Sequence, residues 1–337
     1  MKLLVIRYSS LGDVALAAAV TYALLEANPN LSIWFLSTSS YQPLFNKNPR
    51  LHFVGADLKN QHKGIIGLYA LFKAILSKVK FDAVVDIHDV LRTKFLLFMF
   101  QIKGVNTIRF DKGRKEKKLL LKGKIPFKKL PHTTDRYLNA FKNINLFAEL
   151  NKKNWLETEK SPFVFDKKSR GNIGIAPFAA HQSKEWGIKK ITLLIERLSS
   201  YNIYLFGGGN REIKQLKILT EKFDNCTLIS SNYSFKEELD IIAELDLMIS
   251  MDSANMHLSA LVGTKVISIW GPTHHYFGFG PLNNEELIIE KSIEECPCRP
   301  ASIFGKITTS KQQECAEQTM SLISVEEVLE KTLQALN

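Results

Sequence analysis

The chain has few cysteines and no long apolar run. Among its 337 residues there are four cysteines: Cys226, Cys296, Cys298 and Cys315. So few cysteines in a chain of this length do not form a secreted disulfide framework, and they predict a reducing, cytoplasmic compartment. The apolar run at the N-terminus ends at Arg7, too early for a signal peptide. The longest later run, Phe95–Phe100, is far short of the roughly 20 residues of a membrane span. We expect any membrane contact to be peripheral.

The common nucleotide-binding signatures are also missing. A glycine turn occurs at Gly207-Gly208-Gly209, but no Gly follows at the offset of GxGxxG and no Gly-Lys-Ser/Thr completes a Walker A loop. These absences argue against a P-loop enzyme and make a Rossmann oxidoreductase a poor interpretation. No RNA- or DNA-binding signature is present either.

The remaining composition is that of a globular α/β protein. Hydrophobic residues make up 45% and charged residues 23% of the chain, which excludes a largely disordered or fibrous protein. Short aliphatic runs followed by longer amphipathic segments recur twice, with a polar linker between Glu149 and Gly171. We therefore predict two doubly wound domains, residues 1–160 and 161–337, with a ligand cleft between them. The last helix, near 325–336, is expected to pack on either domain.

The charge is distributed unevenly between these domains. Residues 1–160 carry 27 basic and 12 acidic residues, whereas residues 161–337 carry 18 and 22. Ten of the basic residues lie in Arg109–Lys129, against two acids. This segment is interpreted as a solvated loop, as a surface for an anionic leaflet or a phosphorylated glycolipid, or less favourably as a nucleic-acid contact. Candidate acceptor-binding residues here and in the following helix are Arg114, Lys115, Lys117, Lys118 and Arg136.

The first strand ends in Ser9-Ser10-Leu11-Gly12-Asp13, directly before an alanine-rich helix. This spacing predicts Asp13 in the first helical turn. There it either complements the helix dipole or acts as a general base. Ser9 and Ser10 are candidate donors to an acceptor substrate, and Gly12 permits close approach of a ligand.

The second half opens with a strand and a polar loop that carries Lys184 and Trp186. Lys184 is either a solvated surface lysine or a ligand of a phosphate group, and Trp186 is expected to pack the following helix on the sheet. In the glycine turn, Gly207 and Gly208 allow close backbone approach to a nucleotide. Glu212, which follows them, is a candidate acceptor for ribose hydroxyls.

Two further strand ends carry polar residues. The first reads Asp252-Ser253-Ala254 and leads into a helix with His257 near its start, and the second reads Trp270-Gly271-Pro272-Thr273. Small residues at a helix start leave N–H groups free for a pyrophosphate. His257 is either a structural histidine or part of this phosphate site.

Taken in order, these motifs resemble glycosyltransferase family 9, best known for ADP-heptose:lipopolysaccharide heptosyltransferases. The resemblance implies a GT-B fold, two Rossmann-like domains facing a central cleft, and inverting, metal-independent transfer without a cofactor. It implies that Asp13 is the base, that Lys184 holds the donor phosphates and that Asp252 contacts the donor sugar. Ser253, Ala254 and His257 would surround the pyrophosphate, Glu212 would bind ribose, and Gly207, Gly208, Gly271 and Thr273 would form the donor loop.

The predicted function is transfer of a sugar, heptose from ADP-heptose, to a lipopolysaccharide-core or related anionic glycolipid at the inner face of the cytoplasmic membrane. The alternative is a catalytically silent module of the same fold that binds nucleotide sugar or glycolipid. Cys296, Cys298 and Cys315 invite a zinc interpretation, but zinc sites favour four ligands and wider Cys spacing. Reduced packing cysteines, no metal site and no nucleic-acid partner are therefore expected.

Overall fold

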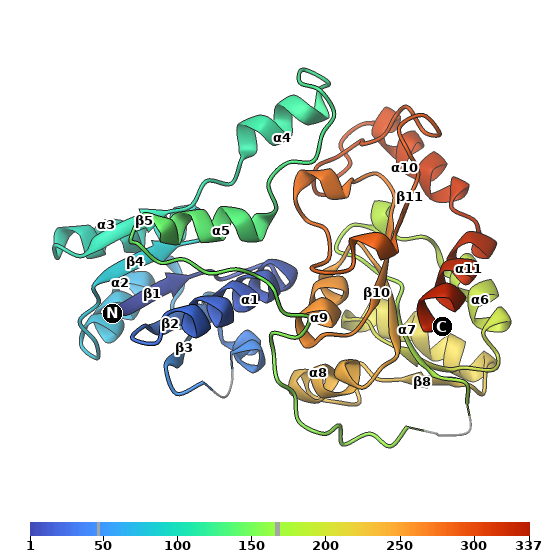
Figure 1. Cartoon of the computed structure of the whole chain (residues 1–337), viewed down its shortest axis with the longest axis horizontal. Coiled ribbons are helices and arrows are strands. Elements are labelled where there is room, and N and C mark those ends of the chain that lie inside the picture. Colours follow the sequence, from blue (N-terminus) through green and yellow to red (C-terminus); the bar gives the residue numbers. More distant parts are fainter. Residues whose placement is uncertain (46–47, 166–168) are drawn as a thin grey trace. The chain divides into compact units, whose positions relative to one another are not determined.

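The computed structural model describes residues 1–45, 48–165 and 169–337. The chain forms two compact units (Figure 1). Unit 1 comprises Met1–Arg114 and Pro131–Glu157, and unit 2 comprises Lys115–Leu130 and Thr158–Asn337. Residues 166–168, in the predicted linker, lie outside the described residues. Both units are α/β, as predicted.

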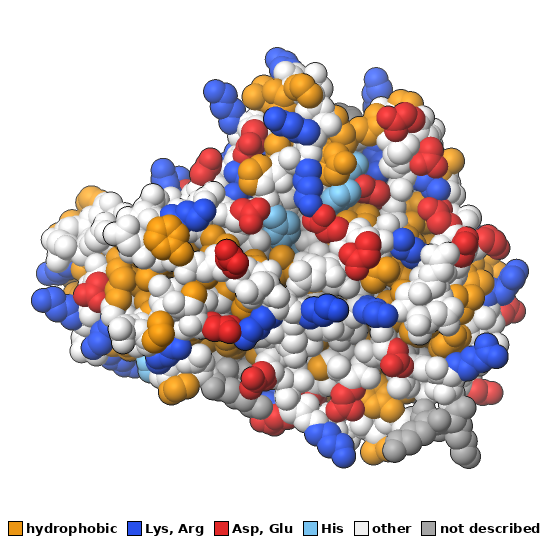
Figure 2. All heavy atoms as spheres, in the orientation of Figure 1, with side chains coloured by type: hydrophobic (Ala, Val, Ile, Leu, Met, Phe, Trp, Pro, Cys, Tyr) orange, Lys and Arg blue, Asp and Glu red, His pale blue; other side chains and the backbone are white. Residues whose placement is uncertain are grey.

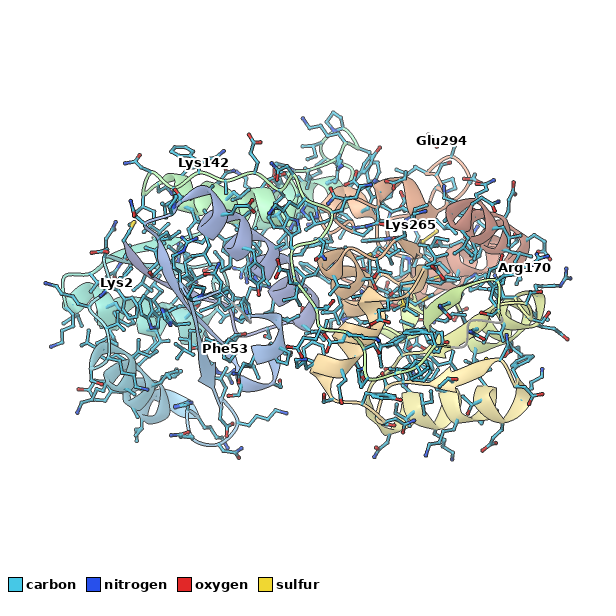
Figure 3. All side chains as sticks on the ribbon, turned by 60° about the horizontal axis from the view of Figure 1, so that its bottom comes forward. Lys2, Phe53, Lys142, Arg170, Lys265 and Glu294 are labelled. Carbon is cyan, nitrogen blue, oxygen red and sulfur yellow. A yellow bond between two sulfur atoms is a disulfide. The ribbon has the colours of Figure 1, made fainter. Side chains whose placement is uncertain are left out.

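Unit 1 is built on a five-stranded parallel sheet in the order β3-β2-β1-β4-β5. Its strands are β1 (Lys2–Ile6), β2 (Ser32–Thr38), β3 (Leu51–Ala56), β4 (Ala83–Asp86) and β5 (Asn106–Arg109). Phe53, labelled in Figure 3, lies on the edge strand β3. Strands β1 and β4 are buried on both faces, and this explains their nearly continuous aliphatic sequences.

Four helices of unit 1 cover the sheet. They are α1 (Leu11–Ala27), α2 (Gly64–Leu76), α3 (Leu91–Ile102) and α5 (Thr133–Lys142), and a short 3-10 turn covers Ser39–Leu44. Helix α1 packs on α5, and α2 packs on α3. Right-handed crossovers put α1 on one face of the sheet and α2 with α3 on the other. Aromatic side chains such as Phe72 and Phe100, in edge contact, fill the core beneath α2 and α3.

Unit 2 contains a six-stranded parallel sheet in the order β11-β10-β9-β6-β7-β8. The strands are β6 (Asn172–Ala176), β7 (Asn202–Leu205), β8 (Cys226–Leu228), β9 (Leu247–Met251), β10 (Val266–Trp270) and β11 (Ile288–Glu290). Strands β8 and β11 were not predicted, because three residues are too few to show the alternation of a strand. Lys265, labelled in Figure 3, directly precedes β10.

Helices alternate with strands in unit 2 from β6 to β10, as predicted. The helices are α4 (Arg114–Leu121), α6 (Ile188–Arg197), α7 (Gly209–Lys222), α8 (Phe235–Ala243), α9 (Ala254–Val262), α10 (Ser310–Leu322) and α11 (Val325–Leu336), with 3-10 turns at Gln182–Lys184, His275–Phe277 and Glu285–Leu287. Of these helices, α4 and α10 were not expected. Helix α11 contacts α6 and β9, so the last helix packs on unit 2. One apolar core, which includes Ile173, Ile249 and Ile267, joins the sheet to these helices.

The basic segment differs from the sequence-based expectation. Residues Lys115–Leu130, with seven lysines and one glutamate, fold with unit 2 rather than with the first domain. Phe127 stacks on Tyr276, Leu130 N donates to Tyr276 O, and Lys117 is buried with its Nζ 4.1 Å from the centre of the Phe279 ring. Counted by unit, the net charge is +9 in unit 1 and +2 in unit 2.

One expectation about the cysteines was wrong. Cys298 and Cys315 form a disulfide that joins the loop before Pro300 to α10, whereas we expected reduced cysteines. Cys226 and Cys296 are free thiols and buried. Burial raises the pKa of Cys226 to about 12, so that thiol is inert packing. Within the described part of the chain, every helix is too short or too polar to cross a bilayer.

Candidate active site

Each sheet has one topological switch point, where the order of the strands along the sheet reverses. In unit 1 it lies between β1 and β4, and in unit 2 between β6 and β9. Open parallel sheets bind ligands just beyond the carboxyl ends of the strands at this point. Nine of the predicted site residues lie after β1, β6 and β9, in the loops or in the first turns of the helices that follow.

In unit 2 the two loops meet through an ion pair. Lys184, which follows β6, donates from Nζ to Asp252 Oδ2 at 3.1 Å, and Asp252 follows β9. Thr273, which follows β10, donates from Oγ1 to the same oxygen at 2.8 Å. Three neighbouring strands therefore contribute to one cluster of predicted donor-binding residues. Lys184 is buried, so its interpretation as a solvated surface lysine is wrong.

The aliphatic part of the Lys184 side chain packs against a glycine that was not predicted as a site residue, Gly305. Gly305 has a φ of +89°, and a Cβ there would lie 2.6 Å from Lys184 Cδ. Ser183 Oγ donates to Gly305 O at 2.6 Å. Trp186 is buried and donates from Nε1 to Ile323 O, which confirms its packing role. Gly305 thus leaves room for the lysine beside the cluster.

The glycine turn after β7 is held by its own residues. Gly207 N donates to Ser230 Oγ at 3.0 Å, and Gly208 N donates to Glu212 Oε2 at 2.7 Å. A Cβ at Gly208 would meet no atom within 4 Å, whereas one at Gly207 would lie 3.0 Å from Leu216 Cδ1. Gly208 therefore has open space beside it, whereas a side chain at Gly207 would press against Leu216.

The start of α9 has the predicted small residues. Ser253 is the N-cap and Ala254 the first helical residue, and Ser253 Oγ lies 3.1 Å from Ser250 Oγ. His257 lies one turn into the helix and is buried. The first N–H groups of α9 therefore lie beside Asp252, in the positive field of the helix start.

An unpredicted arginine organises the loop after β10. Arg299 has a fully buried side chain that donates to Gly271 O at 2.8 Å and to Thr273 O at 2.7 Å. It also pairs with Glu290 at 2.7 Å. Gly271 itself is required by packing, because a Cβ there would lie 2.5 Å from Met320 Cε. Arg299 therefore fixes the backbone that presents Thr273 to Asp252.

The acid beside Arg299 is strongly ionised. Burial alone would raise the pKa of Glu290, but a hydrogen bond from His275 and the charge of Arg299 lower it to about 2. Burial also lowers the pKa of His274 to about 3, so this imidazole is neutral near pH 7. The loop is thus held by one fixed ion pair and a neutral histidine.

In unit 1 the predicted base lies where the spacing placed it. Asp13 is in the first turn of α1, with its side chain 27% exposed. Its Oδ2 accepts from Ser10 Oγ at 2.7 Å, and Arg7 Nη2 lies 2.7 Å from it. Arg7 is buried and donates from Nη1 to Ile87 O at 2.7 Å. Arg7, which the sequence analysis passed over, therefore ties the β1 and β4 strand ends together at Asp13.

The loop after β4 completes this edge. Asp86 Oδ1 accepts from His88 N and Asp89 N at 2.8 and 2.9 Å, and Tyr8 N donates to His88 Nδ1 at 3.4 Å. Burial, with the charges of Arg7 and Lys112, lowers the pKa of His88 to about 3. Burial raises the pKa of Asp86. Asp89 has a φ of +49°, a strained backbone of the kind that gathers at functional sites.

Cations surround Asp89. Lys94, Arg109 and Arg114 lie 3.4, 3.7 and 3.4 Å from its carboxylate. Lys112 Nζ donates to Asp89 O at 3.2 Å, and burial with the nearby Arg114 and Arg7 lowers the pKa of Lys112. Four cations against one carboxylate form a positive cluster at the edge that carries Asp13, and Arg114 is the predicted acceptor residue among them.

The other predicted acceptor residues are divided. Ser9 and Ser10 are exposed beside Asp13, and Gly12 is buried in α1. Arg136 is buried on α5 of unit 1. Three predicted lysines belong to α4 in unit 2. Lys115 and Lys118 are exposed, and Lys117 is buried.

Two clusters among the described residues have the donor atoms that metals use: Cys296, Cys298 and Cys315, and His274, His275 and Glu290. The disulfide occupies two sulfurs of the first, and Arg299 contacts the carboxylate of the second. Protein contacts therefore account for both clusters.

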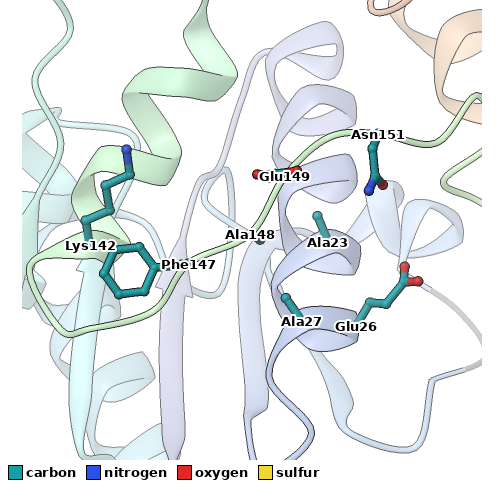
Figure 4. A pocket seen from close by; sticks show the side chains of 8 residues that line it. All are labelled: Ala23, Glu26, Ala27, Lys142, Phe147, Ala148, Glu149 and Asn151. Atoms are coloured by element: carbon teal, nitrogen blue, oxygen red, sulfur yellow. The ribbon is translucent and has the colours of Figure 1, made fainter.

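A cavity of about 630 Å³ in unit 1 lies away from these edges (Figure 4). It is lined by Ala23, Glu26 and Ala27 of α1 together with Lys142 and residues 147–149 and 151. Since α1 starts at the carboxyl end of the sheet, its last turns are about 15–20 Å from Asp13. This cavity is not part of the Asp13 edge.

Two Rossmann-like units, each with charged side chains at the switch point of its sheet, have the architecture of the GT-B type of fold. The sequence profile of glycosyltransferase family 9 (heptosyltransferase) matches residues 68–307, and the chain belongs to this family. A lipopolysaccharide core heptosyltransferase, OpsX, of Haemophilus influenzae is 23% identical, over 97% of this chain and 95% of its own length.

Solved structures of the family share the fold. A family 9 glycosyltransferase from Veillonella parvula superposes with a TM-score of 0.76 at 19% identity, covering 99% of this chain and 97% of its own. The E. coli heptosyltransferase WaaC, solved with ADP, gives a TM-score of 0.72 at 14% identity, covering 99% and 100%. The predicted fold class, family and enzyme class are confirmed.

Proposed function

We propose that this glycosyltransferase moves heptose from ADP-heptose to a lipopolysaccharide-core or related anionic glycolipid, with inversion and without a metal ion or cofactor. The donor is supported by the convergence of Lys184, Thr273 and the α9 start on Asp252. It is supported too by the heptosyltransferase names of the relatives and by the ADP bound to WaaC.

The chemistry follows from charge. As the acceptor oxygen attacks the anomeric carbon, the bond to the diphosphate oxygen breaks and its electron pair leaves with the diphosphate. Lys184 and the α9 N–H groups supply positive charge for that group. Asp252 would contact the sugar and keep Lys184 in place, and Glu212 would bind ribose. A fixed lysine and the helix dipole thus stabilise the negative charge on the departing diphosphate, as a metal ion would.

Asp13 would take the proton of the attacking hydroxyl. Its contacts with Arg7 and Ser10 hold the carboxylate in place. Exclusion of water in the substrate complex would make it a stronger base. Direct displacement with a single base gives inversion.

The cations around Asp89 support an anionic acceptor. Arg114, Arg109 and Lys112 form a cluster of excess positive charge at the Asp13 edge. A phosphate or carboxylate of the acceptor core would bind there by charge-assisted hydrogen bonds. Such an acceptor is lipid-linked, so we propose peripheral binding at the inner face of the cytoplasmic membrane.

The test is a donor screen followed by a transfer assay. Thermal unfolding is measured with ADP-, GDP-, UDP- and CMP-sugars, and a ligand at 100 times its Kd stabilises by about 2.7 kcal/mol. ADP-heptose should stabilise most and should yield a mass increase of one heptose on heptose-free lipopolysaccharide. Binding without transfer to any envelope extract would favour the silent module, and no stabilisation by any sugar nucleotide would contradict the proposal.

A further inference from the structure

Helices α2 and α3 of unit 1 present large apolar side chains to solvent. Ile66 is 87% exposed and Leu91 85%, and Ile65, Tyr69 and Phe98 are exposed as well. Such side chains are normally scattered singly over a soluble protein. Here six of them, with Ile102, lie on two helices that pack against each other. We call this surface, including Ile102, the α2–α3 face.

The apolar residues follow the helical repeat. Phe98 and Ile102 follow Leu91 by seven and eleven positions. At 3.6 residues per turn, both side chains therefore lie within about 20° of the direction of Leu91 around α3. Ile65, Ile66 and Tyr69 occupy the first two turns of α2. Leu71 of α2 and Leu96 and Phe100 of α3, on the opposite sides, are buried in the core. Each helix is therefore apolar on two sides, and among the described residues only one of these sides is packed against the core.

The charge on the two helices has one sign. Neither α2 nor α3 contains an acidic residue. Exposed cations lie within and at the ends of the two helices: Lys63, Lys73, Lys78, Arg92, Lys94 and Lys103. Figure 2 shows hydrophobic side chains on the visible surface of unit 1, among Lys and Arg as well as Asp and Glu side chains. Apolar side chains bordered by cations are typical of helices that lie in the headgroup region of anionic lipid.

The position of the α2–α3 face also fits a lipid. Because α2 and α3 follow β3 and β4, their first turns lie at the carboxyl end of the parallel sheet. Leu91 comes three residues after His88 and two after Asp89, at the edge tied to Asp13 through Arg7. A bilayer against these first turns therefore lies beside the proposed base and the cation cluster.

We propose that the α2–α3 face docks this enzyme on an anionic lipid bilayer. The apolar side chains enter the headgroup region while the flanking lysines and arginines contact lipid phosphates. A second copy of the chain fits less well, because a symmetric contact would set these cations against one another. The biological purpose of docking rests on the proposed lipid-linked acceptor, but the binding itself does not depend on which sugar is transferred.

The test compares the full chain with two triple variants in vesicle cosedimentation. One carries Ile66→Ser, Leu91→Ser and Phe98→Ser. The matched control removes three exposed apolar side chains of unit 2: Val164→Ser, Leu193→Ser and Ile218→Ser. Vesicles contain phosphatidylglycerol with phosphatidylcholine, or phosphatidylcholine alone. We expect the parent chain to bind the anionic vesicles. The α2–α3 variant should bind them at least about tenfold more weakly, and the affinity of the control should stay within about twofold of that of the parent chain.

The proposal is overturned if the parent chain does not bind anionic vesicles, or if both variants lose binding equally. It is also overturned if the α2–α3 variant instead abolishes self-association in sedimentation without lipid, which would make the face a contact between copies. Transfer to a water-soluble, delipidated acceptor should be unchanged in the α2–α3 variant. Failure of that transfer in the parent chain would count against the proposed function and leave the docking result intact.

Discussion

Lys184 Nζ lies 3.1 Å from Asp252 Oδ2, across the point where the second sheet reverses its strand order. The two residues are 68 positions apart in the sequence and become neighbours because β6 and β9 pair directly. A lysine held in this way is a fixed positive charge at the edge where this class of fold binds ligands. The proposed donor-binding site is built around this pair.

Replacing Lys184 with Gln should weaken ADP-sugar binding about 10- to 100-fold, because a charge-assisted bond contributes about 1.5–3 kcal/mol. Isothermal titration of the donor measures this directly. Lys189→Gln, an exposed change on the next helix, is the control and should leave affinity unchanged. Equal affinity in the two variants would refute the role of Lys184.

Gly305→Ala tests the space that the Lys184 stem occupies. The substitution puts a side chain at φ +89° and a Cβ 2.6 Å from Lys184 Cδ. We expect about 1–2 kcal/mol of destabilisation from the backbone alone, together with weaker donor binding because Lys184 must move. Gly208→Ala, which meets no atom within 4 Å, should be tolerated for folding in urea unfolding experiments. Donor affinity unaltered in the Gly305 variant would show that the lysine does not need this position.

Arg299→Lys tests the loop after β10. Lysine keeps the charge but lacks the planar fork that bonds both Gly271 O and Thr273 O. The KM for the donor should rise while the KM for the acceptor stays constant. Arg299→Met should in addition destabilise by about 3–5 kcal/mol, since it removes the arginine charge that faces the largely buried Glu290. If both KM values change together, Arg299 supports the fold in general and not the donor loop.

Acid should destabilise unit 1 through His88. Its pKa is about 3 in the folded chain and about 6.5 when unfolded, so below pH 6.5 the unfolded state binds more protons. Stability is therefore complete above pH 6.5 and falls toward pH 3, by about 2 kcal/mol at pH 5. His88→Asn keeps an acceptor for Tyr8 N and removes this titration. Urea unfolding at pH 7.5 and 5.0 should show a smaller loss in the variant, and an equal loss would disprove the assignment.

The sequence was most informative where a strand pattern ended in polar residues. The spacing from Ile6 to Asp13 predicts a carboxylate in the first helical turn, and α1 has it there. The helix predicted after Asp252-Ser253-Ala254, with His257 near its start, is α9, which small residues begin and Gly263 ends. Local patterns of this kind carry over directly to the structure.

Long-range contacts could not be predicted in this way. Arg299 and Gly305 lie in an irregular loop, and their importance depends on carbonyl groups and a lysine stem more than 25 residues away. The docking of Lys115–Leu130 on Tyr276 and Phe279 is likewise invisible in a basic run. The Cys298–Cys315 disulfide depends on α10, which the pattern did not indicate.

The most direct test of the central claim is the transfer rate of Asp13→Asn, measured with ADP-heptose and heptose-free lipopolysaccharide. Asp135→Asn is the matched control, since Asp135 accepts from His132 N in the first turn of α5 as Asp13 does from Ser10 N in α1. The account predicts that Asp13→Asn lowers turnover about 10²- to 10⁴-fold with donor affinity within a few-fold, while Asp135→Asn retains turnover. Unchanged turnover in Asp13→Asn would contradict it.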